Sequence, residues 1–141
     1  MTLLHASLVA FGTVGVLIRG PSGSGKSQLC LQLMDRNASL VADDQVKLKV
    51  ENKKLMGSAP EALAGMLEIR GLGLVKYPFL AEAEIKLVVD LGPFAEISRM
   101  PEPDEMWVEI LGFNVHRFSL DPQAQAAVQK LQAALTFFQL R

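Results

Sequence analysis

The feature that most constrains this chain is a glycine-rich segment, GPSGSGKS, at residues 20–27. It matches the pattern Gly-x-x-x-x-Gly-Lys-Ser/Thr of the phosphate-binding P-loop. An apolar strand is predicted before it, over 14–18, and a helix with one apolar face after it, over 26–36. Backbone amides between glycines and a helix N-terminus both attract phosphate oxygens. An accidental glycine turn is the alternative, and the full match between a strand and a helix argues against it.

The P-loop predicts the individual contacts of a bound nucleotide. Lys26 is expected to reach the β- and γ-phosphates, and the Ser27 hydroxyl to hold Mg²⁺. The residues expected to bind the nucleotide are Gly20, Pro21, Ser22, Gly23, Ser24, Gly25, Lys26 and Ser27.

Size and composition exclude several classes of protein. We expect a single domain over 1–141, because 141 residues suffice for one sizeable core. A net charge of −1, without a long basic run, disfavours nucleic acid as the main partner. A lone cysteine, Cys30, cannot form an internal disulfide and fits the reducing cytoplasm. We expect no signal peptide and no membrane-spanning segment.

The rest of the pattern alternates short strands with turns. A hairpin over 7–11 and 14–18 leads into the P-loop, and a closing helix is expected to follow Asp121 as N-cap and Pro122. We expect a short helix over 60–66 and irregular chain over 92–105. Further strands are predicted over 39–42, 46–51, 54–56, 67–70, 85–91 and, around Gly112, 107–118.

Two acids, Asp43 and Asp44, end the short apolar strand that follows the P-loop helix. In this position one acid can hold Mg²⁺, directly or through water, and the other can accept a proton from an attacking hydroxyl. A solvated turn is the alternative. Glu68 and Arg70 lie two residues apart, on one side of a strand, where they could serve metal and phosphate chemistry or form a surface ion pair. His5 is either an exposed bystander or a functional side chain.

Together these motifs resemble the catalytic domain of the HPr kinase/phosphorylase family. The resemblance rests on His5, the hairpin, the P-loop, VADD at 41–44 and LEIRGLG at 67–73, which occur in one order and spacing. It is specific up to about Val75 and weaker up to about Arg99. The chain is similar to the short alphaproteobacterial members, which consist of this domain only. It departs from the family at Gln28 and in a loop over 76–80.

The resemblance implies a fold and a reaction. The fold is α/β, a phosphoenolpyruvate carboxykinase-like P-loop domain in which helices pack on a mixed β-sheet with hairpins. The reaction is transfer of phosphate from ATP, with Mg²⁺, to a serine of the phosphocarrier protein HPr, and in long members also phosphorolysis. The expected partners are an HPr-type protein and ATP, with no nucleic acid and no membrane; homo-oligomerisation is left open.

The resemblance also implies roles for individual residues. Asp43 takes the proton from the target serine, and His5 lies beside Asp43 and tunes its charge. Arg70 contacts the transferred phosphate, and Arg99 matches a second arginine near it. The implied metal ligands are Ser27, Asp44 and Glu68.

Two other functions stay open from the sequence. A small-metabolite P-loop kinase would have a parallel sheet and an arginine-rich lid. The second is a nucleotide-sensing regulatory module without catalysis, which does not explain why Asp43, Glu68 and His5 are all present.

Overall fold

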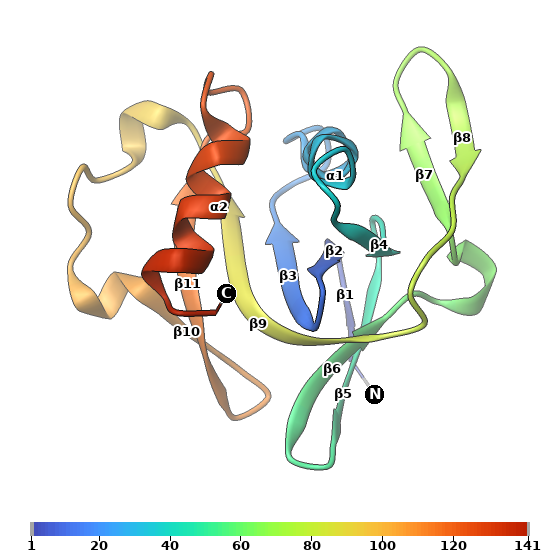
Figure 1. Cartoon of the computed structure of the whole chain (residues 1–141), viewed down its shortest axis with the longest axis horizontal. Helices are drawn as coiled ribbons and strands as arrows, with labels where there is room; N and C mark the ends of the chain where they lie inside the picture. Colours follow the sequence, from blue (N-terminus) through green and yellow to red (C-terminus); the bar gives the residue numbers. More distant parts are fainter. Residues whose placement is uncertain (1, 141) are drawn as a thin grey trace.

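The hairpin that precedes the P-loop lies in the middle of a curled sheet (Figure 1). The structure of the protein is a computed structural model that describes residues 2–140. Strands β2 (Ala6–Phe11) and β3 (Val14–Arg19) pair antiparallel around a turn in which Gly12 has φ +61°. Their side chains alternate between the two faces of the sheet, and nearly all are buried because both faces are covered.

The large sheet has nine strands within the described residues, and its pairing is mixed. Strand β9 (Ala83–Leu91) pairs parallel with β3 and with β11 (Phe113–Leu120). The other strand pairs of this sheet are antiparallel. The remaining strands are β1 (Thr2–Leu4), β4 (Ser39–Ala42), β5 (Val46–Glu51), β6 (Lys54–Ser58) and β10 (Trp107–Ile110). The predicted α/β fold with a mixed sheet and hairpins is confirmed.

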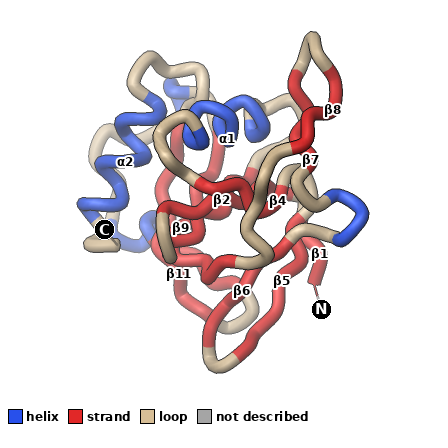
Figure 2. The backbone as a smooth tube through the Cα atoms, turned by 45° about the vertical axis from the view of Figure 1, so that its right-hand side comes forward, coloured by secondary structure: helices blue, strands red, loops and turns tan. Residues whose placement is uncertain are grey.

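Two helices, α1 (Lys26–Met34) and α2 (Ala127–Phe137), pack on one face of this sheet (Figures 1 and 2). Side chains of β3 show the division between the faces. Val16 and Ile18 join the cluster that includes Leu29 and Leu131 of the helices, whereas Leu17 points to the opposite face. In that second cluster, side chains of β5 and β6 such as Leu48 and Leu55 pack with Leu8 of β2. Burial on both sides makes the end of β3 a firm base for the P-loop.

A separate hairpin, β7 (Met66–Ile69) and β8 (Gly73–Lys76), extends from the body beside α1 (Figure 2). Leu67 anchors it, because its side chain is fully buried in the same cluster as the helix residues Leu29 and Leu33. The tip of the hairpin is exposed, and Leu72 and Leu74 are 79% and 66% accessible there. The segment carrying LEIRGLG is therefore anchored by Leu67, with Ile69 packed against the same cluster, and exposed at its tip.

Several predicted helices differ from the observed ones. The closing helix begins at Ala127 and not directly after Asp121, because the chain over 122–126 forms turns. The Asp121 carboxylate accepts hydrogen bonds from the backbone amides of Gln123, two residues further on, and of Phe94. The helix expected over 60–66 is only a 3₁₀ turn, η1 (Glu61–Leu63). The irregular segment contains two more, η2 (Phe94–Glu96) and η3 (Pro103–Met106). Within residues 2–140, no helix is long and apolar enough to cross a membrane.

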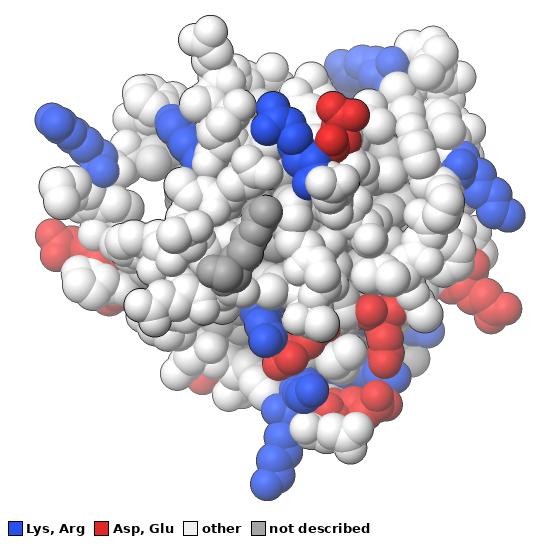
Figure 3. Space-filling model, in the orientation of Figure 1, with Lys and Arg blue, Asp and Glu red and all other residues white. Residues whose placement is uncertain are grey.

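Acidic and basic side chains are interspersed on the face shown in Figure 3. Near the β5–β6 hairpin, at the bottom of that view, both signs gather together. In β5, Lys49 forms ion pairs with Glu51 and Glu82. These exposed pairs add little to stability.

Candidate active site

The P-loop connects the end of β3 to the start of α1 and leaves the helix N-terminus without a side-chain cap. Gly23 and Gly25 have φ of 80° and 103°, a region that side chains rarely adopt. Gly25 is the N-cap residue and contributes no side chain to the first N–H groups of α1. These donors have no partner within the helix, so an anion at this end would satisfy them.

Neighbouring segments hold the loop in shape from behind. A Cβ added to Gly20 would lie 2.6 Å from Ser24 Oγ and 3.2 Å from the Cβ of Leu91, at the end of β9. A Cβ on Gly25 would lie 3.2 Å from Pro122, in the segment after β11. Both glycines are thus needed for close packing, and the ends of β9 and β11 help to fix the loop.

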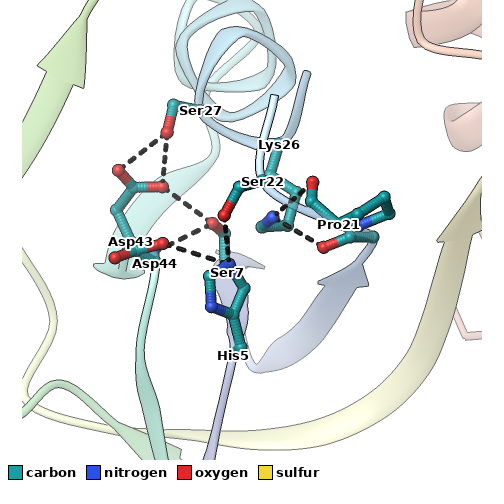
Figure 4. Close-up of polar contacts among 9 residues, drawn as sticks. His5, Ser7, Pro21, Ser22, Lys26, Ser27, Asp43 and Asp44 are labelled. Atoms are coloured by element: carbon teal, nitrogen blue, oxygen red, sulfur yellow. Dashed lines mark hydrogen bonds and ion pairs between the residues drawn. The ribbon is translucent and has the colours of Figure 1, made fainter. Parts of the chain in front are cut away.

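Lys26 folds back over the P-loop in this structure (Figure 4). Its ammonium donates hydrogen bonds to the carbonyls of Gly20 at 2.7 Å and Pro21 at 3.1 Å, and the residue is 6% exposed. The hydroxyl of Ser24, in the same loop, is buried without a hydrogen-bond partner among the described residues. A buried cation and an unsatisfied hydroxyl beside free helix N–H groups fit the needs of a phosphate.

Asp43 leaves the end of β4 and points toward the start of α1 (Figure 4). Ser27 Oγ lies 2.9 Å and 2.8 Å from its two carboxylate oxygens, and Ser7 Oγ donates to Oδ1 at 2.7 Å. Asp43 is only 7% exposed. This carboxylate therefore faces the hydroxyl that a P-loop offers to a metal ion.

Asp44 turns the other way and meets His5. Its backbone has φ 70°, in the left-handed region, and its side chain is 61% accessible. His5 Nε2 lies 3.3 Å from Asp44 Oδ1 and 3.5 Å from Ser22 Oγ of the P-loop. The contact predicted for His5 was with Asp43, and the structure gives it with Asp44 instead. The two acids thus face different surroundings although they are adjacent in sequence.

The residues at this site fit a nucleotide with Mg²⁺ rather than a metal bound by protein alone. Within the described residues, no cluster of three or more His, Cys, Asp or Glu could hold a metal ion. Mg²⁺ usually takes one or two carboxylates and fills its other positions with phosphate oxygens and water. Ser27 and Asp43 offer hard oxygen atoms next to the P-loop, as that chemistry requires.

Three other predicted site residues are not brought to the P-loop here. Glu68 and Arg70 lie in the β7–β8 hairpin, and Arg99 lies in the segment between η2 and η3; all three are exposed. In the part of the chain that the structure describes, none of them forms a hydrogen bond or ion pair with the P-loop or the aspartates. Their roles stay predictions.

The family described as HPr Serine kinase C-terminal domain matches residues 1–135. This chain belongs to that family. Among curated proteins, the HPr kinase/phosphorylase of Clostridium tetani is 49% identical over 79 residues, which are 56% of this chain and 26% of the relative. That of Geobacillus thermodenitrificans is 38% identical over 149 aligned residues, which are 96% of this chain and 48% of the relative.

A solved structure, the Hpr(Ser) kinase/phosphatase from Coxiella burnetii, has the same fold as this family member. Its TM-score is 0.86 at 28% identity, and the match covers 99% of this chain and 92% of that one. The family match confirms the resemblance predicted from the motifs. The chain spans about half or less of the length of the curated relatives named here, 48% and 26%.

Sequence reasoning missed a second charged group beside the P-loop. Asp90 at the end of β9 accepts hydrogen bonds from Arg19 Nε at 2.7 Å and Nη2 at 2.9 Å, and from Arg117 Nε. Arg117 also donates to Ser119 Oγ at 3.0 Å. Only strand order places these residues together, since Arg19 and Asp90 are 71 positions apart.

Ser7 was missed as well. It lies in β2, two residues after His5, and the sequence predicted it only as the first residue of a strand over 7–11. One polar side chain in the otherwise apolar run over 6–11 was the one signal that the sequence offered.

Proposed function

We propose that this chain is a Mg²⁺-dependent kinase that transfers the terminal phosphoryl group of ATP to a serine of an HPr-type phosphocarrier protein. One observation carries the proposal: an uncapped P-loop faces two adjacent carboxylates in different surroundings, one beside Ser27 and one beside His5. Phosphoryl transfer needs one group that helps to bind the metal ion beside the charged phosphates and one that accepts the proton of the attacking hydroxyl. Family membership supports the choice of substrate.

The P-loop residues 20–27 would hold the nucleotide. The free N–H groups of α1 and the Ser24 hydroxyl would contact phosphate oxygens, and Lys26 would exchange its two carbonyl partners for the phosphates. A cation already at the loop needs only a side-chain rotation to meet them, which favours binding without rearrangement of the backbone.

The metal would be held on the Ser27 side. Bound Mg²⁺ would neutralise charge on the β- and γ-phosphates. Ser27 would present its oxygen to the ion and its proton to Asp43, since Ser27 Oγ already lies 2.8 Å from Asp43 Oδ2. We therefore assign Asp43 to the metal side, directly or through water, and Glu68 as a further ligand. This exchanges the roles that the sequence predicted for Asp43 and Asp44.

Asp44 would accept the proton from the target serine. It is the more exposed acid, so a serine carried on another protein can approach it, whereas Asp43 is enclosed by Ser7 and Ser27. His5 would orient the Asp44 carboxylate through their 3.3 Å contact. A protonated Asp44 would also be able to give its proton to the serine oxygen as that oxygen leaves the phosphoryl group, with inorganic phosphate as the attacking group and pyrophosphate as the product. Phosphorolysis of the phosphoserine is therefore the second candidate activity.

The arginines would act from the two flanking segments. Arg70, in the β7–β8 hairpin, and Arg99, after η2, would contact the transferred phosphate once nucleotide and partner are bound. We place the protein in the cytoplasm as a single catalytic domain. The small-metabolite kinase is disfavoured by the sheet, because β2 pairs antiparallel with both β3 and β4.

The test is to incubate the protein with γ-labelled ATP, Mg²⁺ and HPr from the same cell, and to locate the label by mass spectrometry. We expect one phosphoserine on HPr, and none with the Lys26→Ala variant, which removes the cation that would contact the phosphates. HPr whose target serine is changed to alanine serves as the matched substrate control. Rapid labelling of a small metabolite with none on HPr would support the metabolite kinase instead. ATP binding without any transfer would support the regulatory module.

A further inference from the structure

Ser7 is a buried hydroxyl that the reaction outlined above does not use. It lies in β2 and is 0% exposed. Its Oγ donates a hydrogen bond to Asp43 Oδ1 at 2.7 Å and accepts one from the backbone N–H of Asp44 at 3.2 Å (Figure 4). One side chain thus contacts both acids of the site, from a strand 36 residues away from Asp43 in sequence.

The backbone that Ser7 supports is strained. Asp44 has φ 70°, and the N–H of Gln45 donates to the carbonyl of Asp43 at 2.8 Å. This is a three-residue γ-turn with positive φ at its centre, a rare conformation for a residue with a side chain. Strain of this kind persists only where the surroundings hold it in place, and it is concentrated at functional sites. The hydrogen bond from Asp44 N–H to Ser7 is such a restraint.

The chemistry of a hydroxyl suits this double contact. A serine has one proton and two lone pairs, so it can accept from the Asp44 amide and donate to the Asp43 carboxylate at the same time. A buried methyl group can do neither, and both partners would then lose a hydrogen bond. The nearby thiol of Cys30 adds no charge at neutral pH, because burial raises its pKa.

We propose that Ser7 is a positioning residue that fixes Asp43 against Ser27 and turns Asp44 toward His5. The proposal rests on the kinase function above for its consequence in turnover. Ser7 touches neither nucleotide nor partner; it acts through the two aspartates. Its loss should therefore affect metal use and phosphoryl transfer, and leave the phosphate contacts of the P-loop alone.

A matched pair of variants isolates the hydroxyl. Ser7→Thr and Ser7→Val have nearly the same shape, and both add a methyl group to a strand that tolerates branched side chains. The affinity for a fluorescent ATP analogue is measured with and without Mg²⁺, and the single-turnover rate of HPr phosphorylation is measured at saturating ATP. We expect Ser7→Val to lose most of the Mg²⁺-dependent gain in affinity and about 10- to 100-fold in rate, the scale of a misplaced group.

The other expected values complete the test. Metal-free ATP affinity should stay within about twofold in both variants, and Ser7→Thr should stay within about fivefold of wild type in rate, because it keeps the donor and acceptor. Equal Mg²⁺ response and equal rates in Ser7→Thr and Ser7→Val would overturn the proposal. The proposal would also be overturned if the ATP affinity of the wild-type protein did not change when Mg²⁺ was added.

Failure of the kinase function gives a different result. If wild type binds Mg²⁺ and ATP but leaves HPr unlabelled, the proposed function fails, and Ser7 is judged on the Mg²⁺ response of the two variants alone. Thermal unfolding checks that both variants are folded. Should Ser7→Val not fold, Ser7→Ala replaces it; if that variant is also unfolded, Ser7 is a structural residue and the proposal is wrong.

Discussion

At the scale of single residues, the two adjacent aspartates have different surroundings because of one backbone angle. Asp43 ends a buried strand and keeps its side chain under α1, whereas the positive φ of Asp44 turns the next side chain toward His5 and solvent. If the strand simply continued, Asp43 and Asp44 would also point to opposite faces. The positive φ of Asp44 additionally brings its side chain to His5, which in turn contacts Ser22 of the P-loop. The turn therefore creates two environments within one dipeptide.

The different roles proposed for Asp43 and Asp44 predict different kinetic effects when each is changed to asparagine, which has nearly the same shape. Asp44→Asn should bind ATP and Mg²⁺ nearly normally but lose about 10²–10⁴ in single-turnover rate, because an amide cannot accept the proton. Asp43→Asn should raise the Mg²⁺ concentration needed for half-maximal rate, since a neutral amide is a poorer ligand for a hard cation. Nucleotide titrations and single-turnover rates across a Mg²⁺ series measure both effects.

His5→Gln is the control for the contact between His5 and Asp44, because it removes the imidazole but keeps a hydrogen-bonding group of similar reach.

If Asp43→Asn abolishes transfer at saturating Mg²⁺ while Asp44→Asn only shifts the Mg²⁺ requirement, the roles predicted from sequence for the two aspartates are right and those proposed here are wrong.

At the scale of elements, the β7–β8 hairpin is the part of the proposed site that stands apart. Its inner face is fixed by Leu67, whereas Glu68, on the neighbouring position, lies on the exposed face. Gly71 and Gly73 have φ of 92° and 114° at the turn, with no atom within 4 Å of an added Cβ. The turn therefore needs glycine for its backbone conformation and not for close packing.

Glu68→Gln should slow turnover and weaken the Mg²⁺ response more than it weakens ATP binding, because it removes a charged oxygen ligand. Glu61→Gln is a matched control: Glu61 is another exposed glutamate, on η1, at the base of the same hairpin. The measurement is the initial rate of HPr phosphorylation over a range of Mg²⁺ concentrations. Identical curves for the two variants would make Glu68 an ordinary surface residue.

At the scale of the whole molecule, one group of charged side chains joins the three parallel strands β3, β9 and β11. Asp90 on β9 lies between Arg19 on β3 and Arg117 on β11. Burial works against ionisation of Asp90, but the hydrogen bonds and charges of the two arginines outweigh it and hold its pKa below the ordinary value of 3.8. Since Arg19 directly precedes the P-loop, this group links the sheet to the site.

Asp90→Asn should lower the free energy of unfolding by about 1–3 kcal/mol at pH 7, because it leaves two partly buried guanidinium groups short of their acceptor. The pKa of Asp90 is lower in the folded state, so its contribution is present above the ordinary value and is lost as the pH falls through the folded one. The difference between wild type and Asp90→Asn should therefore be constant from pH 7 to 5 and shrink below about pH 4. Urea unfolding at several pH values measures it; Glu96→Gln, an exposed change on η2, is the control. A difference that does not depend on pH would show that the arginines do not lower the pKa.

The sequence by itself determined the local elements that carry chemistry. The P-loop, the hairpin before it, the helix after it and the acids at 43–44 follow from patterns within a few residues, because glycine, alternation and helical periodicity are local effects. The order and spacing of the family motifs, which can also be read directly from the sequence, identified the fold class. The Asp121 carboxylate accepts the Gln123 amide, as an N-cap would, and also the amide of Phe94, which is distant in sequence, but the helix begins only at Ala127.

Only the tertiary structure decided which of these residues meet. The pairing of His5 with Asp44 depends on the positive φ of Asp44, and the contact of Ser7 with both acids depends on β4 lying beside β2. The group around Asp90 depends on the parallel pairing of β9 with β3 and β11. Strand order and backbone turns arise from packing of the whole chain, and no local pattern encodes them.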